Sequence, residues 1–469
     1  MEKIEGITVV SPMWGERTVT DRMVDSVVNQ YFGKDDPINV ELVLVDDYLE
    51  SVKEAEKLLK KAEEKNGVDS SEYKYWEDQL NRRKNGESPY EYYLSEEFKR
   101  AHANYNPERM SIKLIRNEKH KYQGESREIG FLAGKYDWFL LVDCDDMIAP
   151  NACDRYRHII DSYYKEDENG ERVEKGDLAC VHGLLYSFGE HGYEHNIIGE
   201  SIWVQSRCYN RKFIVENDIH FPTGTNSRQG EDYPFIREFD YALKHSTPKW
   251  NGVKVPYDAG IDCQCTAYWF PNDNSLSRQD PHYGQHLAGW TMASSNKIYE
   301  YFQEYNKKHG IEDSEDEVMK QEILNMVVYA FYNVLDFLRE VAATDYDPKV
   351  EDWDALRINV ADLKYKLKSV FWDEIVYSDI YDMLSNVKHH SDIRFCESWL
   401  GDFLKFMNKG FIIKIKDNRS KDILDLTYDE MREYCKTLEF DGAGHEVPSS
   451  QVKAWLRRHP APVNNEVNV

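Results

Sequence analysis

Two apolar segments that end in clusters of aspartates constrain the fold of this chain more than any other feature. The segments are VELVLVDD at 40–47 and DWFLLVDCDD at 137–146, and their terminal acids are Asp46, Asp47, Asp143, Asp145 and Asp146. Short apolar runs with polar boundaries are typical of buried strands in a parallel sheet, where ligands bind beyond the carboxyl ends. Carboxylates gathered there repel one another unless a cation lies between them. The pattern therefore predicts an α/β fold with a divalent cation, Mn²⁺ or Mg²⁺, at one edge of its sheet.

Strands and helices alternate around these segments. GITVVSP at 6–12 predicts a first strand, TVTDRMVDSVVNQYF at 18–32 has apolar residues at helical spacing, and SIKLIRN at 111–117 predicts a further strand before a helix near 124–134. Such β-α-β units require parallel neighbouring strands. The sequence therefore predicts a Rossmann-like, mostly parallel sheet.

Two regions depart from this alternation. Residues 50–108 contain charged, helix-forming runs broken by glycines, which predicts a helical insertion. Beyond about residue 290, two apolar stripes at helical spacing predict long packed helices. The stripes are Met319, Ile323, Met326, Val327, Ala330, Phe331, Val334, Leu338 and Val341, and then Trp353, Leu356, Val360, Leu363, Leu367 and Val370. Because 469 residues exceed what one core usually serves, we expect an α/β domain at 1–290 and an α-helical domain at 291–469.

The composition narrows the classes of partner and compartment. The formal net charge of −26 disfavours nucleic acid as a partner, although a local basic groove can override it, and a bound nucleotide diphosphate needs a cation beside it. The eight cysteines show no paired spacing, and the lone C-x-C of Cys263 and Cys265 favours buried thiols over zinc. We expect a cytoplasmic protein, because the opening residues do not resemble a leader and no apolar run approaches about 20 residues.

Six motifs occur in the order and spacing of one enzyme family. They are VVSPMWGER at 9–17, LVLVDD at 42–47, GESREIGFLAG at 124–134, FLLVDCDD at 139–146, RQGEDYPF at 228–235 and WFPNDNSLSRQ at 269–279. Over residues 5–282 the chain resembles family 2 glycosyltransferases, which carry a proline-containing opening, V-D-D, arginine, D-x-D, E-D and N-x-S-x-[ST]-R motifs. The resemblance implies a GT-A fold and a metal-dependent, inverting hexosyl- or pentosyltransferase, whose donor is most often a uridine diphosphate sugar. Glu128 departs from the family pattern, in which Asn usually follows the arginine, and Met13 to Gly15 replaces the common T-Y-N.

The same resemblance implies roles for individual residues. The donor-binding candidates are Pro12, Glu16, Asp46, Asp47, Arg127, Asp143 and Arg278. Asp145 would coordinate the metal, and Asp143 and His282 are further candidates for its shell. Asp232, preceded by Glu231, would be the catalytic base.

Elementary chemistry supports these assignments but leaves alternatives open. A carboxylate such as Asp232 can take the proton of an acceptor hydroxyl, and a metal with Arg278 can stabilise a departing diphosphate. Equally, acidic strand ends and the Glu231–Asp232 pair can serve as helix caps, and Arg278 can form a surface ion pair. His286 lies near His282, and four aromatic residues can stack on acceptor rings or simply be buried: Trp203, Tyr268, Trp269 and Trp290.

Three other functions remain open on the sequence. A nucleotidyltransferase shares the fold logic, although the glycine-rich phosphate loop expected after its first strand is missing. A sugar-nucleotide or glycan-binding module would keep the fold without turnover. A modified base in DNA as acceptor would need a basic groove, for which the candidates are Lys113, Arg116, Lys119 and Lys121.

Overall fold

The computed structural model describes most of the chain. The described residues are 4–13, 17–33, 37–102, 104–163, 177–189, 192–197, 204–224, 230–246, 257–269, 283–343, 347–373, 375, 397–410, 412–415, 419–437, 439–440 and 446–447. They fall into two compact units, Met1–Arg278 and Gln279–Val469. No helix in the described part is long and apolar enough to cross a membrane.

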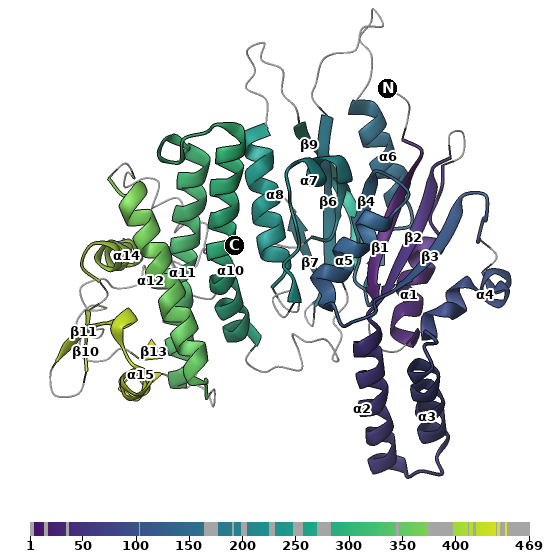
Figure 1. Cartoon of the computed structure of the whole chain (residues 1–469), viewed down its shortest axis with the longest axis horizontal. Coiled ribbons are helices and arrows are strands. Elements are labelled where there is room, and N and C mark those ends of the chain that lie inside the picture. Colours follow the sequence, from purple (N-terminus) through teal and green to yellow (C-terminus); the bar gives the residue numbers. More distant parts are fainter. Residues whose placement is uncertain are drawn as a thin grey trace, which may run out of the picture. The chain divides into compact units, whose positions relative to one another are not determined.

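The first unit is built on a sheet whose first four strands are parallel. The strands are β1 (Gly6–Met13), β2 (Asn39–Asp46), β3 (Met110–Arg116) and β4 (Trp138–Leu141), in the spatial order β3-β2-β1-β4. Helices α1 (Arg17–Val28) and α5 (Tyr122–Ala133) provide two of the crossovers. Because parallel strands end at one edge, the acids that follow β2 and β4 lie along the same edge (Figure 1).

Antiparallel pairings enter in the second half of the sheet. The remaining strands are β5 (Met147–Ile148), β6 (Asp177–Gly189), β7 (Gly192–Ile197), β8 (Arg207–Asn210) and β9 (Tyr257–Trp269). The described residues form nine strands of one sheet, with β8 antiparallel to β4 and β6, and β6 parallel to β9. The predicted α/β fold is confirmed, with a sheet that is mixed because short antiparallel strands extend its parallel half.

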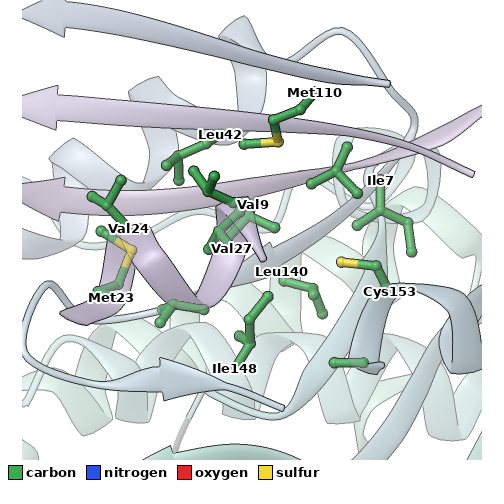
Figure 2. Packing of buried hydrophobic residues seen from close by; sticks show 14 of the residues in the cluster. Ile7, Val9, Met23, Val24, Val27, Leu42, Met110, Leu140, Ile148 and Cys153 are labelled. Atoms are coloured by element: carbon green, nitrogen blue, oxygen red, sulfur yellow. The ribbon is translucent and has the colours of Figure 1, made fainter. Parts of the chain in front are cut away.

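Helices cover both faces of the parallel strands. Successive residues of β1 point to opposite faces, so Val9 packs with Met23 and Val27 of α1 (Figure 2), whereas Val10 faces α5. At the contact with α5, an added Cβ on Gly130 would lie 2.2 Å from Val10 Cγ1. Glycine therefore permits the close approach of the helix that carries Arg127. The first unit also contains α6 (Ala152–Tyr163), α7 (Arg211–Glu216) and α8 (Asp232–Ser246).

The predicted insertion is a helical hairpin that starts where β2 ends. Its helices are α2 (Tyr48–Asn66) and α3 (Ser71–Lys84), followed by η1 (Pro89–Leu94) and α4 (Glu96–Ala101). The hairpin has its own small core of Ala55, Ala62, Trp76 and Leu80, and it extends from the sheet edge at the end of β2 (Figure 1). Tyr90 and Tyr93 of η1 return the chain to the main core.

The second unit is mainly helical, as predicted. Its elements are α10 (Tyr283–His309), η3 (Asp313–Glu315), α11 (Glu317–Ala343), α12 (Val350–Val370), α14 (Glu397–Lys409), β10 (Ile412–Lys414), β11 (Ser420–Asp422), η6 (Ile423–Asp425), α15 (Tyr428–Cys435), β12 (Glu439–Phe440) and β13 (Glu446–Val447). Both predicted apolar stripes face inward, except that Val341 and Val370 are half-buried. Helix α10 runs without a break from Tyr283 through residue 290, the boundary that the sequence predicted, and the chain divides into its two compact units at 278/279.

Candidate active site

The side chain of Arg127 joins three carboxylates from distant parts of the chain. It lies on the buried face of α5 and is 2% exposed. One terminal nitrogen donates to Glu231 Oε1 at 2.6 Å and to Asp232 Oδ1 at 2.5 Å, and the other donates to Asp143 Oδ1 at 2.6 Å. The D-x-D motif after β4 and the E-D motif at the start of α8 therefore lie side by side.

Two glutamines complete the support of Asp143. Gln123 Nε2 donates to Asp143 Oδ1 at 3.0 Å, and Gln205 Nε2 donates to Asp143 Oδ2 and to Asp146 Oδ2, each at 2.8 Å. Asp143 is thus oriented by hydrogen bonds to both of its oxygens. Gln205 in turn links the two outer acids of the D-C-D-D segment, which fixes the loop on which Asp145 lies.

The electrostatics of this cluster favour an added cation or proton. Three carboxylates surround one guanidinium, so full ionisation leaves a surplus of two negative charges at a mostly buried place. Burial, together with Glu231 and Asp143, raises the pKa of Asp232 to about 8, although Arg127 opposes the shift. A carboxyl whose pKa lies near neutrality is well matched to general-base chemistry.

Asp47 holds the loop that leads into α5. Its Oδ2 accepts hydrogen bonds from His120 Nδ1 at 2.6 Å and from the backbone N–H of Tyr122 at 2.8 Å, and its Oδ1 accepts one from the N–H of Lys121 at 3.0 Å. Tyr122 has a φ of +60°, a conformation that bulky residues rarely adopt. Asp47 makes no cap hydrogen bond to α2. Its carboxylate therefore stabilises a strained turn at the edge where the donor was predicted to bind.

Asp145 is the acid for which a role in metal binding was predicted. Its side chain is half-buried, and Arg22 donates a hydrogen bond to its backbone carbonyl. In the described part of the chain, no three His, Cys, Asp or Glu side chains are grouped so as to hold a metal ion. One or two carboxylates suffice, however, when water and substrate phosphates supply the other ligands, as is usual for Mg²⁺. The residues present fit a metal that arrives with a diphosphate.

Comparison with known proteins identifies similar structures but no family. No family model and no curated protein matches the chain. S. aureus TarS has a TM-score of 0.42 at 11% identity, over 86% of this chain and 55% of that one. TarS 1-349 in complex with UDP-GlcNAc gives 0.39 at 12%, over 83% and 94%. The mannosyltransferase PcManGT from Pyrobaculum calidifontis, in complex with GDP-Man and Mn2+, gives 0.33 at 10%, over 80% and 89%. At these identities and TM-scores the likenesses settle neither family nor activity.

Of the predicted site residues, the structure brings Asp143, Glu231 and Asp232 together around Arg127. Asp46 is buried at the end of β2, and Pro12 is buried in β1 beside Val45. The predicted roles of Glu16, Arg278 and His282 lie outside the described residues, as does Trp203. The side chains of His286, Trp269 and Trp290 are also outside the description, whereas Tyr268 is half-buried against the main core.

Most of the basic residues proposed to line a nucleic-acid groove are bound to other groups of the protein. Lys113 Nζ donates to the carbonyl of Ala133 at 2.8 Å, Arg116 binds Glu91 and the carbonyl of Gly86, and Lys121 pairs with Glu125 at 3.0 Å. These bonds leave less positive charge for a phosphate backbone. They therefore weigh against DNA as an acceptor.

Sequence reasoning missed the two glutamines. Gln123 lies four residues before Arg127, and residues at this spacing share a helix face, so its proximity to the arginine was readable. Gln205 lies 62 residues from Asp143 in the sequence, and no local pattern connects them. Cys144, Cys153, Cys180, Cys208 and Cys435 are free and buried. The buried thiols predicted for Cys263 and Cys265 concern side chains that lie outside the described ones.

Proposed function

We propose that this chain is a metal-dependent, inverting glycosyltransferase that moves a sugar from a nucleotide diphosphate, with uridine as the first candidate base, onto an acceptor hydroxyl. The observation that carries the proposal is the Arg127 bridge, which places Asp143 of the D-x-D motif next to Asp232 of the E-D motif. Sugar transfer by a single displacement needs a group that helps to bind the donor and a carboxylate that acts as the base, and these two acids supply them.

Asp232 is the catalytic base in this proposal. Its carboxylate takes the proton of the acceptor hydroxyl while the acceptor oxygen bonds to the anomeric carbon, and the bond from that carbon to the diphosphate oxygen breaks. One displacement inverts the anomeric centre. Arg127 orients Asp232 through a hydrogen bond. Its positive charge also lowers the pKa of Asp232, so that part of the Asp232 side chains is ionised. Because Asp232 also lies in the first turn of α8, the helix dipole favours its ionised form.

Asp145 would bind the metal, and Asp143 would have a supporting role. A bound Mn²⁺ or Mg²⁺ would supply positive charge to the departing diphosphate. The surplus negative charge around Arg127 supports a need for such a cation. Asp143 already accepts hydrogen bonds at both oxygens, so we assign it mainly to the orientation of Asp145 and of the donor.

A ligand panel tests the proposal. Thermal unfolding is followed with UDP, UDP-GlcNAc, GDP and GDP-Man, each with and without Mn²⁺, and release of the nucleoside diphosphate is then measured. A ligand at about 100 times its dissociation constant stabilises a protein by about 2.7 kcal/mol, which shifts the midpoint by degrees. We expect a manganese-dependent shift with one nucleotide and slow release from its sugar.

The other outcomes separate the rival functions. One outcome is that a nucleotide sugar shifts the unfolding midpoint and yet releases no nucleoside diphosphate over a long incubation with simple glycosides or water as acceptors. That result would indicate a binding module. Pyrophosphate release from a nucleoside triphosphate and a sugar phosphate would indicate a nucleotidyltransferase. No shift with any nucleotide would refute the donor site.

A further inference from the structure

Glu128 follows Arg127 on α5 but binds a different segment. Its Oε1 accepts a hydrogen bond from His220 Nδ1 at 2.7 Å, and its Oε2 accepts one from the backbone N–H of Phe221 at 2.8 Å. One turn earlier, Glu125 Oε2 accepts a hydrogen bond from the N–H of Gly224 at 3.3 Å. Segment 219–224 is thus tied to α5 at two points. Glu128 is also one of the two places at which this sequence departs from the family pattern.

The same segment is packed against α8, the helix that begins with Asp232. The ring of Phe221 stacks on Phe235 with centroids 4.1 Å apart and planes 6° apart, and the N–H of His220 donates to Glu238 Oε2 at 3.3 Å. The guanidinium carbon of Arg127 lies 5.8 Å from the Phe221 ring centroid. Phe221 therefore contacts both the helix that carries the base and the side chain that orients it.

We infer that Glu128 and His220 are positioning residues for Asp232, which act by holding segment 219–224 between α5 and α8. The inference rests on the proposed function for its kinetic consequence, but not for its structural one. Glu128 binds the N–H of Phe221, and the Phe221 ring sets how closely α8 approaches Arg127. Release of this contact lets the first turn of α8 move away from the guanidinium, so the base loses its orientation.

Charge around His220 reinforces this contact. Its hydrogen bond to Glu128 raises the pKa of His220, and the nearby carboxylates Glu238 and Asp218 raise it further, while burial opposes the shift. Burial also raises the pKa of Glu238, to about 8. Since the folded pKa of His220 is raised, its charged pairing is complete below the unfolded value of about 6.5 and fades as the pH rises through the folded value. The hydrogen bond that the N–H of Phe221 donates to Glu128 does not depend on the charge of His220 and remains at higher pH.

The test combines hydrogen exchange with steady-state kinetics on the full chain. The variants are Glu128→Ala, Glu128→Asp, which keeps the charge but is one methylene too short, and Glu128→Gln, which keeps an oxygen for the N–H of Phe221. Glu216→Ala is the control, because it removes a surface ion pair with Lys212 whose members are both about half exposed. Glu128→Asp also decides the question if Glu128→Ala does not fold.

We expect amide exchange in 219–224 and in the first turn of α8 to rise about fivefold in the Ala and Asp variants, as loss of one hydrogen bond predicts, and to stay near wild type in the Gln variant and the control. On a donor that the wild type uses, kcat falls about tenfold or more in the Ala and Asp variants, while the KM for the donor changes little. The acidic limb of the pH profile moves to higher pH, because Asp232 loses part of the influence of Arg127.

Unchanged exchange in the first turn of α8 would overturn the inference, whether or not the chain is a transferase. So would a kcat equal to that of the wild type despite increased exchange, or a Gln variant as impaired as the Ala variant. Absence of diphosphate release by the wild type would refute the proposed function alone, and the exchange result would still decide whether Glu128 positions Asp232.

Discussion

At the scale of residues, the site is a balance between one buried arginine and several acids. Arg127 is held by three carboxylates that raise its pKa, although burial lowers it. For Asp232 the effect of burial exceeds that of the nearby arginine, and its pKa is raised to about 8. Such a site is poorly arranged for stability in the free protein. It is well arranged to receive a cation and a proton.

Replacement of Asp232 by Asn should therefore stabilise the free protein at alkaline pH. The folded pKa of about 8 lies above an unfolded value of about 3.9, so the wild type loses stability as the pH rises from about 4 through 8. Thermal unfolding from pH 5 to 9 should show a shallower decline for Asp232→Asn and a higher midpoint than wild type at pH 9. A decline as steep as in the wild type would show that Asp232 is not the titrating group.

Replacement of Asp145 by Asn should act on the metal rather than on the base. We expect the nucleotide-induced shift in unfolding temperature to lose its dependence on Mn²⁺, because the carboxylate proposed to bind the cation is gone. Asp347→Asn, whose side chain is 77% exposed in an ion pair with Arg432, is the control for the loss of an acid. Retention of the full manganese effect in Asp145→Asn would assign the metal to other residues.

At the scale of elements, close packing between α5 and the sheet sets the position of Arg127. Gly130→Ala should destabilise the protein by about 1–3 kcal/mol, because the added methyl meets Val10 Cγ1 at 2.2 Å. Leu132→Ala on the same helix should change stability little, since that side chain is 51% exposed. Denaturant unfolding measures both. Equal stability of Gly130→Ala and wild type would mean that α5 can shift outward without cost.

The same elements show what the sequence could and could not predict. Apolar runs and terminal acids located β1, β2 and β4 and the acids beyond them, because strand burial and strand ends are local properties. The insertion at 50–108 was equally readable from its charge and glycines. The bridge from Arg127 to Glu231 and Asp232 spans more than 100 residues, and Gln205 joins the site only through the pairing of β8 with β4. Contacts between residues so far apart in the sequence depend on the topology of the sheet.

At the scale of the whole molecule, charge restricts the acceptor. With a net charge of −26, and with three of the four candidate basic residues (Lys113, Arg116 and Lys121) bound to protein groups, the chain should not bind DNA. Fluorescence polarisation with labelled single- and double-stranded DNA should show no binding at about 150 mM salt. Binding that weakens steeply as salt increases would contradict this expectation and reopen a modified base as acceptor.

In the proposed mechanism, Asp232 and the acids joined to Arg127 form one transfer site. The most direct measurement is release of nucleoside diphosphate, with Mn²⁺, from the donor that stabilises the protein, by the wild type and by Asp232→Asn at equal folded concentration. We expect release by the wild type and a loss of about 100-fold or more in the variant, with the donor-induced thermal shift nearly intact. Equal release by the two proteins would show that Asp232 is not the base.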